Sequence, residues 1–282
     1  SKQLRKKKEA ALNVKRANIP FPGWETLDAE REEEAAQVVL SIQDNSGNVI
    51  NKVSQRANKG SARIAWDFRH FNPYSVSDRA SRYNRGGALA KPGTYKASLA
   101  LVQNGEVIPL DGPISFEVKA IRDGVLQGID HEEYNAYLAE VTQLYKNISA
   151  VRDVLSESGK MQKAMTNALK KSSILPGTLE PKLAVLKADL TRINRSLSGS
   201  PSRSEVGERN PAGLGNFISD AMRGLNNSYG PTPLHAKSLE IAKELFGELK
   251  AEVEAINQQR IPEIEWALKA AGAPYIIGQG ID

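Results

Sequence analysis

The chain of 282 residues contains no cysteine. This absence excludes disulfide bonds, thiolate zinc sites and cysteine nucleophiles, but it identifies no compartment, because cysteine-free proteins occur on both sides of a bacterial inner membrane. No apolar run approaches the roughly 20 residues that a membrane-spanning helix needs, so we expect no membrane span. The sequence begins Ser-Lys-Gln, without an apolar signal-peptide core. A first residue other than Met is what we expect of a piece of a longer protein.

Sets of residues that carry chemistry are also lacking. The sequence contains no Gly-x-Ser-x-Gly elbow, phosphate-binding loop or dinucleotide fingerprint. His70, His131 and His235 lie far apart and show no metal-ligand spacing, so each is interpreted as an ordinary surface or capping residue. The run 44–48, Asp-Asn-Ser-Gly-Asn, lacks the terminal glutamate of a calcium loop and is interpreted as a hairpin turn. We therefore predict no catalytic residues, no metal site and no cofactor.

Positive charge is concentrated at one end of the chain. Residues 1–16 hold seven Lys or Arg and one Glu, a balance of +6, so the other 266 residues sum to −1 of the net +5. This pattern favours a solvated basic helix or arm, followed by an acidic run at 28–34. DNA binding by a whole domain needs a clustered basic face, so we expect no nucleic-acid partner; contact through residues 1–16 is the weaker alternative. The proline-containing stretch 19–24 predicts an extended connector whose Phe21 and Trp24 pin it to a neighbouring surface.

From residue 35 the apolar residues alternate with a period of two, which is typical of strands buried on one face. The strands are expected near residues 38–42, 49–53, 60–68, 95–101, 106–110 and 114–118. Their turn signals predict an antiparallel sandwich of about 90 residues. In the stretch 60–68 the alternation places Trp66 in the core, and Asp67 is expected to cap the loop that follows. Tyr95 is likewise assigned a structural position.

The segment 69–91 is too long for a simple hairpin. Loops of this length are often functional or face a partner, and aromatic residues and arginines are enriched at interfaces. Arg69, Tyr74, Tyr83 and Arg85 are therefore the candidate contacts for a partner or ligand. The equally weighted alternative is that the aromatic rings fold back over the edge of the sandwich.

After residue 122 the apolar residues recur every three or four positions, which indicates amphipathic helices. Three helices are expected to begin at Asp130, Thr178 and Thr232. Gly159 should weaken the first helix, and Pro262 should kink or divide the third. The long connection before the third helix is expected to hold a short helix near residues 214–225. Three such apolar stripes close a core when their helices pack together.

The predicted fold is therefore mixed: an antiparallel Ig-like β-sandwich followed by an antiparallel three-helix bundle. The expected divisions are a basic helical arm and connector at 1–34, the sandwich at 35–122 and the bundle at 123–282.

The order of the short motifs resembles a known arrangement. Asp44–Val49, Gly60–Arg69 and Lys91–Tyr95 resemble the turn, the Trp-Asp strand and the Pro-Gly-x-Tyr strand of Ig-like modules of the flagellar hook-capping type. The ending Trp266–Tyr275 and the connector Phe21–Trp24 are similar to the C-terminal region of large bacterial proteins named glycosyl hydrolases. In those proteins the N-terminal part is a sortilin- or sialidase-like β-propeller.

The resemblance implies that any carbohydrate-cleaving activity belongs to a propeller outside this chain. The chain would be a non-catalytic accessory module in the periplasm or outside the cell, since such proteins are usually exported. Its partner would be that propeller or another protein, and a glycan is a further candidate. The alternative function is a carbohydrate-binding module that uses the 69–91 loop. No catalytic residue of the family matches a position here.

Overall fold

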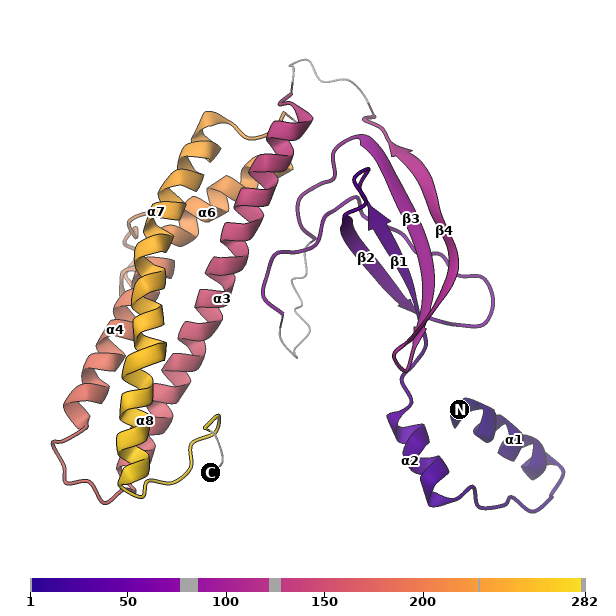
Figure 1. The fold of residues 1–282 in the computed structure, drawn as a ribbon, viewed down its shortest axis with the longest axis horizontal. Helices are drawn as coiled ribbons and strands as arrows, with labels where there is room; N and C mark the ends of the chain where they lie inside the picture. Colours follow the sequence, from indigo (N-terminus) through magenta and orange to yellow (C-terminus); the bar gives the residue numbers. More distant parts are fainter. Residues whose placement is uncertain (1, 77–85, 122–127, 228, 280–282) are drawn as a thin grey trace. The chain divides into compact units, whose positions relative to one another are not determined.

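The computed structural model describes residues 2–76, 86–121, 128–227 and 229–279. The chain divides into two compact units (Figure 1). The sheet unit comprises Ser1–Phe71 and Ala90–Ile121, and the helical unit comprises Asn72–Leu89 and Arg122–Asp282. The expected combination of an antiparallel sheet with helices is thus confirmed. The stretch 72–89, here called the insert, leaves the sheet unit and belongs with the helices.

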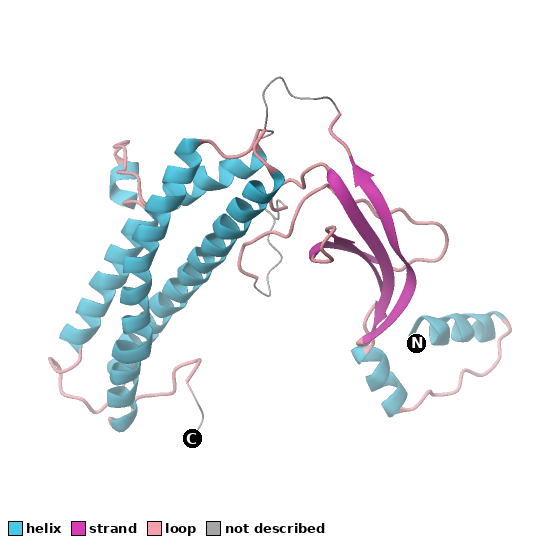
Figure 2. Cartoon of the chain, turned by 45° about the horizontal axis from the view of Figure 1, so that its top comes forward, coloured by secondary structure: helices cyan, strands magenta, loops and turns pink. Residues whose placement is uncertain are grey.

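The sheet unit contains one antiparallel sheet of four strands in the order β2-β1-β3-β4 (Figure 2). The strands are β1 (Gln37–Gln43), β2 (Val49–Arg56), β3 (Gly93–Gln103) and β4 (Glu106–Val118). Leu40 pairs with Val53 on one side and Leu99 on the other, so the apolar members of the alternating pattern share a face. Asn104 and Gly105, both with positive φ, form the two-residue turn between β3 and β4.

The core of the sheet unit lies over one end of this face. Ile42, Ile50 and Tyr95 are buried there, and the partly buried Trp66 and Phe116 pack against them. The Trp66 ring centroid lies 5.6 Å from that of Tyr95 and 6.2 Å from that of Phe116, both edge-on. Such contacts are favourable beyond the burial of area.

Two strand predictions were wrong. Gly60–Phe68 is irregular rather than a strand: its backbone has positive φ at both ends, at Gly60 and Phe68, and Trp66 between them packs against the sheet core without the segment joining the ladder. Residues 106–110 and 114–118 belong to the single strand β4, which continues through a bulged region against β3. The described residues therefore contain four strands rather than the expected six, and a second stacked sheet is not among them.

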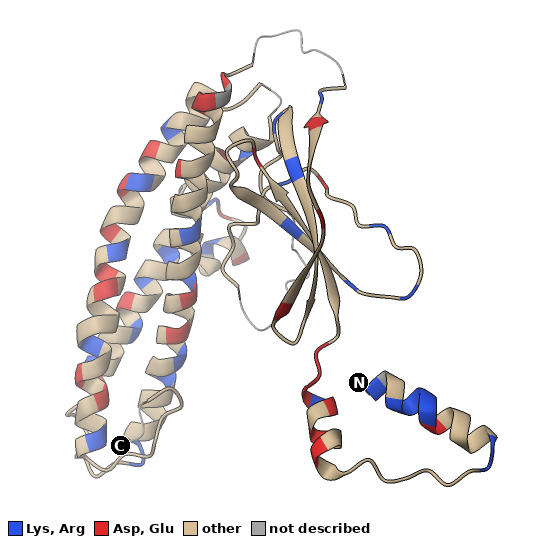
Figure 3. Ribbon diagram, turned by 45° about the vertical axis from the view of Figure 1, so that its right-hand side comes forward, with Lys and Arg blue, Asp and Glu red and all other residues tan. Residues whose placement is uncertain are grey.

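The N-terminal segment forms two helices, α1 (Lys2–Val14) and α2 (Trp24–Glu32). Trp24 begins a helix, so the expectation that it ends an extended connector was wrong. Figure 3 shows that the charged residues of α1 are mostly basic and those of α2 mostly acidic. Arg5 of α1 binds Glu30 of α2 through Nε and Nη2, at 2.9 and 2.7 Å. This fork geometry joins the two helices.

The helical unit contains six α-helices in its described residues. They are α3 (His131–Leu169), α4 (Glu180–Ser198), α5 (Pro201–Glu205), α6 (Leu214–Arg223), α7 (Pro233–Ala255) and α8 (Ile261–Ala270). Short η1 (Gly224–Asn226) follows α6, and the π-helical turn η2 (Ile256–Arg260) joins α7 to α8.

The predicted caps of these helices were partly right. Asp130 caps α3 by accepting from the Glu132 N–H, and Thr232 caps α7. Thr178 does not cap α4, whose N-cap is Leu179. Helix α3 continues through Gly159 without a break, because packing outweighs the low helix propensity of one glycine.

The apolar stripes of these helices form one core. Members with no exposed surface include Val141 and Ile148 of α3, Leu186 of α4 and Ala242 of α7. Helix α3 contacts α4, α7 and α8, and α6 packs against α7. None of the helices in the described part of the chain is long and apolar enough to cross a membrane.

Candidate functional site at the insert and helix α3

The predicted contact residues do not gather in one place. Arg69 belongs to the sheet unit and Tyr74 to the helical unit. Tyr83 and Arg85 lie outside the described residues. The long loop therefore has two parts, its base in the sheet unit and the insert in the helical unit.

At the base of the loop, side chains bind the backbone around Arg69. The Arg69 carbonyl accepts hydrogen bonds from Trp66 Nε1 at 2.8 Å and from Asn51 Nδ2 at 2.6 Å. Asp67 Oδ1 accepts from the Arg69 N–H at 3.2 Å, and the two side chains lie within ion-pair distance. Trp66 thus combines its half-buried ring with an indole bond, while Asp67 binds the first residue of the loop.

Burial shifts the pKa of two titratable groups near this base. Burial lowers the pKa of His70, and the carboxylate of Asp44 opposes that shift. The Tyr95 hydroxyl donates to the Lys91 carbonyl at 2.6 Å, and burial raises its pKa. A neutral imidazole and a neutral phenol are therefore favoured at pH 7, as expected for packed side chains.

The first part of the insert is bound to α3. The rings of Tyr74 and Tyr145 meet edge-on, with centroids 5.0 Å apart and planes at 87°. The Ser75 N–H donates to Ser149 Oγ at 3.0 Å, and the two serine hydroxyl oxygens lie 2.8 Å apart. Asn72 Oδ1 accepts from the Tyr74 N–H, which turns the chain toward the helix.

The last part of the insert enters the helical core. Ala88 is 4% exposed and belongs to the same apolar cluster as the helices. The Tyr134 hydroxyl lies 3.2 Å from the Leu89 carbonyl and 3.0 Å from the Leu225 carbonyl. Both described ends of the insert are therefore held by α3.

The α3 residues that hold Tyr74 and Ser75 form a second stripe beside the main apolar one. Tyr145, Ser149 and Arg152 follow at helical spacing, so they share a face. Burial first, and then the Tyr74 hydroxyl, raise the pKa of Tyr145. Arg152 Nε is buried and has no hydrogen-bond partner within the described residues. The sequence analysis did not identify this stripe, although the sequence itself shows the three residues at helical spacing.

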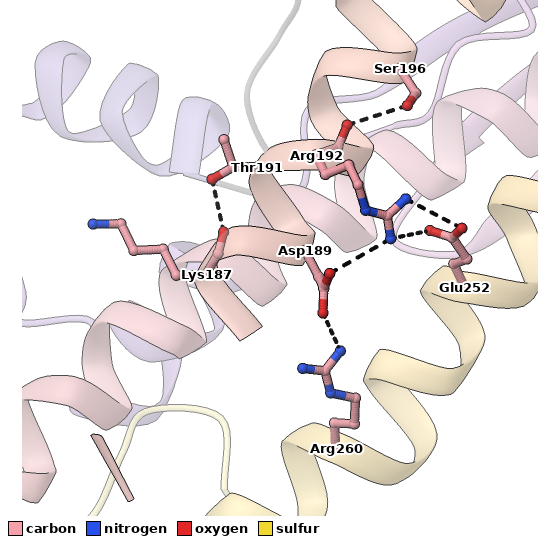
Figure 4. Close-up of polar contacts among 7 residues, drawn as sticks. All are labelled: Lys187, Asp189, Thr191, Arg192, Ser196, Glu252 and Arg260. Carbon is pink, nitrogen blue, oxygen red and sulfur yellow. Dashed lines mark hydrogen bonds and ion pairs between the residues drawn. The ribbon is translucent and has the colours of Figure 1, made fainter. Parts of the chain in front are cut away.

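A second polar cluster lies between α4 and the α7–η2 segment (Figure 4). Arg192 binds Glu252 at 2.8 and 3.3 Å, and Arg260 binds Asp189 Oδ2 at 2.7 Å. Asp189 also lies 3.7 Å from Arg192, which links the four groups. The hydrogen bond from Arg260 is the main reason that the pKa of Asp189 is lowered. The charges of this cluster are paired with one another and join the helices, so a structural role explains why they gather here.

Hollows open on the described part of the helical unit, and three of them are considered for a ligand. A volume of about 430 Å³ beside α4 and α7 is lined by Arg195 and Glu248, and one of about 350 Å³ between α3 and α7 by Phe246. A third, about 490 Å³, lies beside Trp266 and Tyr275. No histidine lines any of the three. Among the described residues, no group of three or more His, Asp or Glu could hold a metal ion.

Comparisons with known proteins identify no relative. The chain matches no family model, no curated protein and no solved structure.

Proposed function

We propose that the chain is a non-catalytic accessory and interaction module of a larger exported protein whose other part is a glycosyl-hydrolase-like β-propeller. In this proposal the sheet unit derives from an Ig-like sandwich, and the irregular stretch around Trp66 takes the place of a second sheet. The helical unit derives from an antiparallel three-helix bundle built on α3, α4 and α7. The motif resemblance described above supports the identity of the larger protein.

The observation that carries the interaction role is the exposure of apolar side chains on β4. Ile108, Leu110 and Ile114 are 45, 51 and 55% exposed. Ile108 pairs with Leu101 and Ile114 with Ala97, so both isoleucines lie on the apolar face of the sheet. Exposed apolar groups that gather on one element are typical of surfaces that bind other proteins.

The contact would use side chains rather than the free edge of β4. Pro109 and Pro113 lie within this edge strand and lack the N–H that an added strand would need. The register also shifts on both sides of Leu99. Prolines and bulges are common ways to protect an edge from strand addition. A partner that packs flat on the apolar face fits this arrangement.

The test is binding between this chain and the propeller-containing part of its parent protein. A complex is expected, and the double variant Ile108→Asp/Ile114→Asp should weaken it at least about tenfold, since burying two unpaired charges is costly. Val107→Asp is the matched control, because residue 107 points to the opposite face. Equal weakening by the control, or no complex, would contradict the proposal.

The non-catalytic part is tested with the chain alone. Release of chromophore from aryl glycosides should not exceed the blank, and turnover that survives repurification would contradict the proposal. Export is part of the same proposal and places the protein in the periplasm or outside the cell. A signal peptide and a propeller in the same reading frame are the expected result.

Carbohydrate binding by the 69–91 loop is the second candidate. It is favoured by one observation, the 52% exposure of Tyr74, whose ring contacts Tyr145 in a T-shaped arrangement. A tyrosine ring that is this exposed could stack on a sugar. Glycan-array binding that is lost in Tyr74→Ala but kept in Tyr275→Ala, a similarly exposed tyrosine, would support this function. An array on which the chain binds no glycan would contradict this function.

A further inference from the structure

The N-terminal helix pair exposes a surface that is both basic and apolar. Helix α1 has a half-buried face formed by Arg5, Glu9 and Leu12. At about 100° per residue, the positions 4, 7, 11 and 14 lie on the opposite face. Those positions are Leu4, Lys7, Ala11 and Val14, and all four are exposed.

The charged residues of α1 differ in what they bind. Arg5 is engaged by Glu30 and Glu9, so the only acidic residue of α1 is already used. Lys6, Lys7 and Lys8 are exposed and have no ion pair with any described residue. The free charge of this helix is therefore entirely positive.

Apolar groups continue from α1 into the connector and the start of α2. Leu4 is 62% exposed, Val14 85%, Phe21 61% and Trp24 74%. The rings of Phe21 and Trp24 contact one another edge-on at 5.0 Å, yet neither belongs to a core cluster of the described residues. Exposed aromatic and aliphatic side chains on a helix pair that also carries unpaired lysines are typical of a surface that a partner covers.

We propose that α1 and the Phe21–Trp24 pair dock on an anionic phospholipid surface. Lysines near such a surface are attracted to its phosphates, and Trp and Phe insert at the boundary between headgroups and acyl chains. Nucleic acid fits less well, because it would satisfy the lysines and could stack on Trp24 but would leave Leu4 and Val14 in water. The docking is peripheral and independent of the partner proposed for β4.

The experiment measures binding of the full chain to sedimented vesicles. Vesicles of phosphatidylcholine with one-quarter phosphatidylglycerol should bind it, and vesicles of phosphatidylcholine alone should not. Binding should decline from about 0.1 to 1 M salt, as the screening length falls from about 10 to about 3 Å. Lys6→Glu/Lys7→Glu/Lys8→Glu should weaken binding by about a hundredfold, since each lysine near an anionic surface contributes about fivefold.

Matched controls distinguish binding by the N-terminal helix pair from effects of net charge and from non-specific hydrophobic binding. Lys146→Glu/Lys163→Glu/Lys187→Glu makes the same charge change at exposed lysines of the helical unit and should weaken binding far less. Trp24→Ala should weaken binding, whereas Trp266→Ala, at an equally exposed tryptophan, should not. Unchanged unfolding midpoints would confirm that the variants fold. Equal losses in the controls, no vesicle binding, or binding to duplex DNA alone would overturn the proposal.

Discussion

The hydroxyl oxygens of Ser75 and Ser149 lie 2.8 Å apart, although 74 positions separate the two residues. Ser149 is 7% exposed and accepts the backbone N–H of Ser75 as well. Ser149→Ala should leave that N–H without its partner and cost about 1 kcal/mol. Hydrogen exchange of residues 72–76 should accelerate. Ser156→Ala, at an exposed position of the same helix, should have no effect, and equal exchange in both variants would show that this bond does not hold the insert.

Trp66 is expected to stabilise the sheet unit. Trp66→Ala removes a half-buried ring and its indole bond to the Arg69 carbonyl. The free energy of unfolding should fall by about 3 kcal/mol, near the lower end for large aromatic residues because the ring is only partly enclosed. Urea titration followed by near-ultraviolet circular dichroism measures this. Trp24→Ala is the control, and a loss as small as the control's would mean that Trp66 is a surface residue.

Two glycines of the helical unit should respond to alanine in opposite directions. Gly230 has φ +92°, and a Cβ there would lie 2.0 Å from Ile129 Cγ2. Gly230→Ala should therefore lower the free energy of unfolding by about 2 kcal/mol or more. Gly247 lies inside α7 with nothing within 4 Å of its Cβ position. Gly247→Ala should raise stability by about 0.5–1 kcal/mol. Thermal or urea unfolding of both variants measures the two changes. A change of stability in the same direction for both variants would contradict the prediction.

Alkaline pH should destabilise the helical unit through Tyr137. Burial raises the pKa of its hydroxyl to about 12, and that hydroxyl donates to the Ala221 carbonyl. Because the folded pKa exceeds the ordinary value of about 10, the stabilisation is complete below pH 10 and disappears as the pH rises toward 12. Tyr137→Phe should be less stable at pH 8 but lose less stability by pH 11.

Absorbance at 295 nm and urea midpoints at the two pH values measure this difference. Tyr229→Phe, whose exposed ring makes no hydroxyl bond to a described residue, is the control. An identical alkaline loss in wild type and Tyr137→Phe would assign the effect to other groups. Burial also raises the pKa of Tyr145, so part of the loss should persist.

Local signals in the sequence predicted local structure well. Asn104-Gly105 predicted the β3–β4 turn, and Thr232-Pro233 predicted the start of α7, because each depends on neighbouring backbone conformations alone. The alternation at Gly60–Phe68 was misleading. A segment that covers a sheet presents alternate side chains to it much as a strand does, so alternation alone could not show whether the backbone joins the ladder.

The candidate site could be predicted only as a loop. Nothing near Tyr74 in the sequence indicates that its ring meets Tyr145, since that contact depends on how the helices pack. Burial of Ala88 among helices is equally non-local. The pairing of α1 with α2 was missed for a related reason. In the sequence, an acidic stretch after prolines resembles a solvated linker, and only the structure shows that Glu30 in this stretch binds Arg5.

Because the insert and the helices come from separate stretches of sequence, the helical unit must be completed late during synthesis. Residues 72–89 leave the ribosome before β3 and β4, and all of α3 to α8 follow. Pro73 and Ala88, both buried in the finished structure, have no core to enter until those helices emerge. The strands of the sheet unit can pair first, since they are complete by residue 118. The chain therefore has a built-in order of assembly, in which a segment encoded between the strands of the early unit finds its place only when the late unit forms.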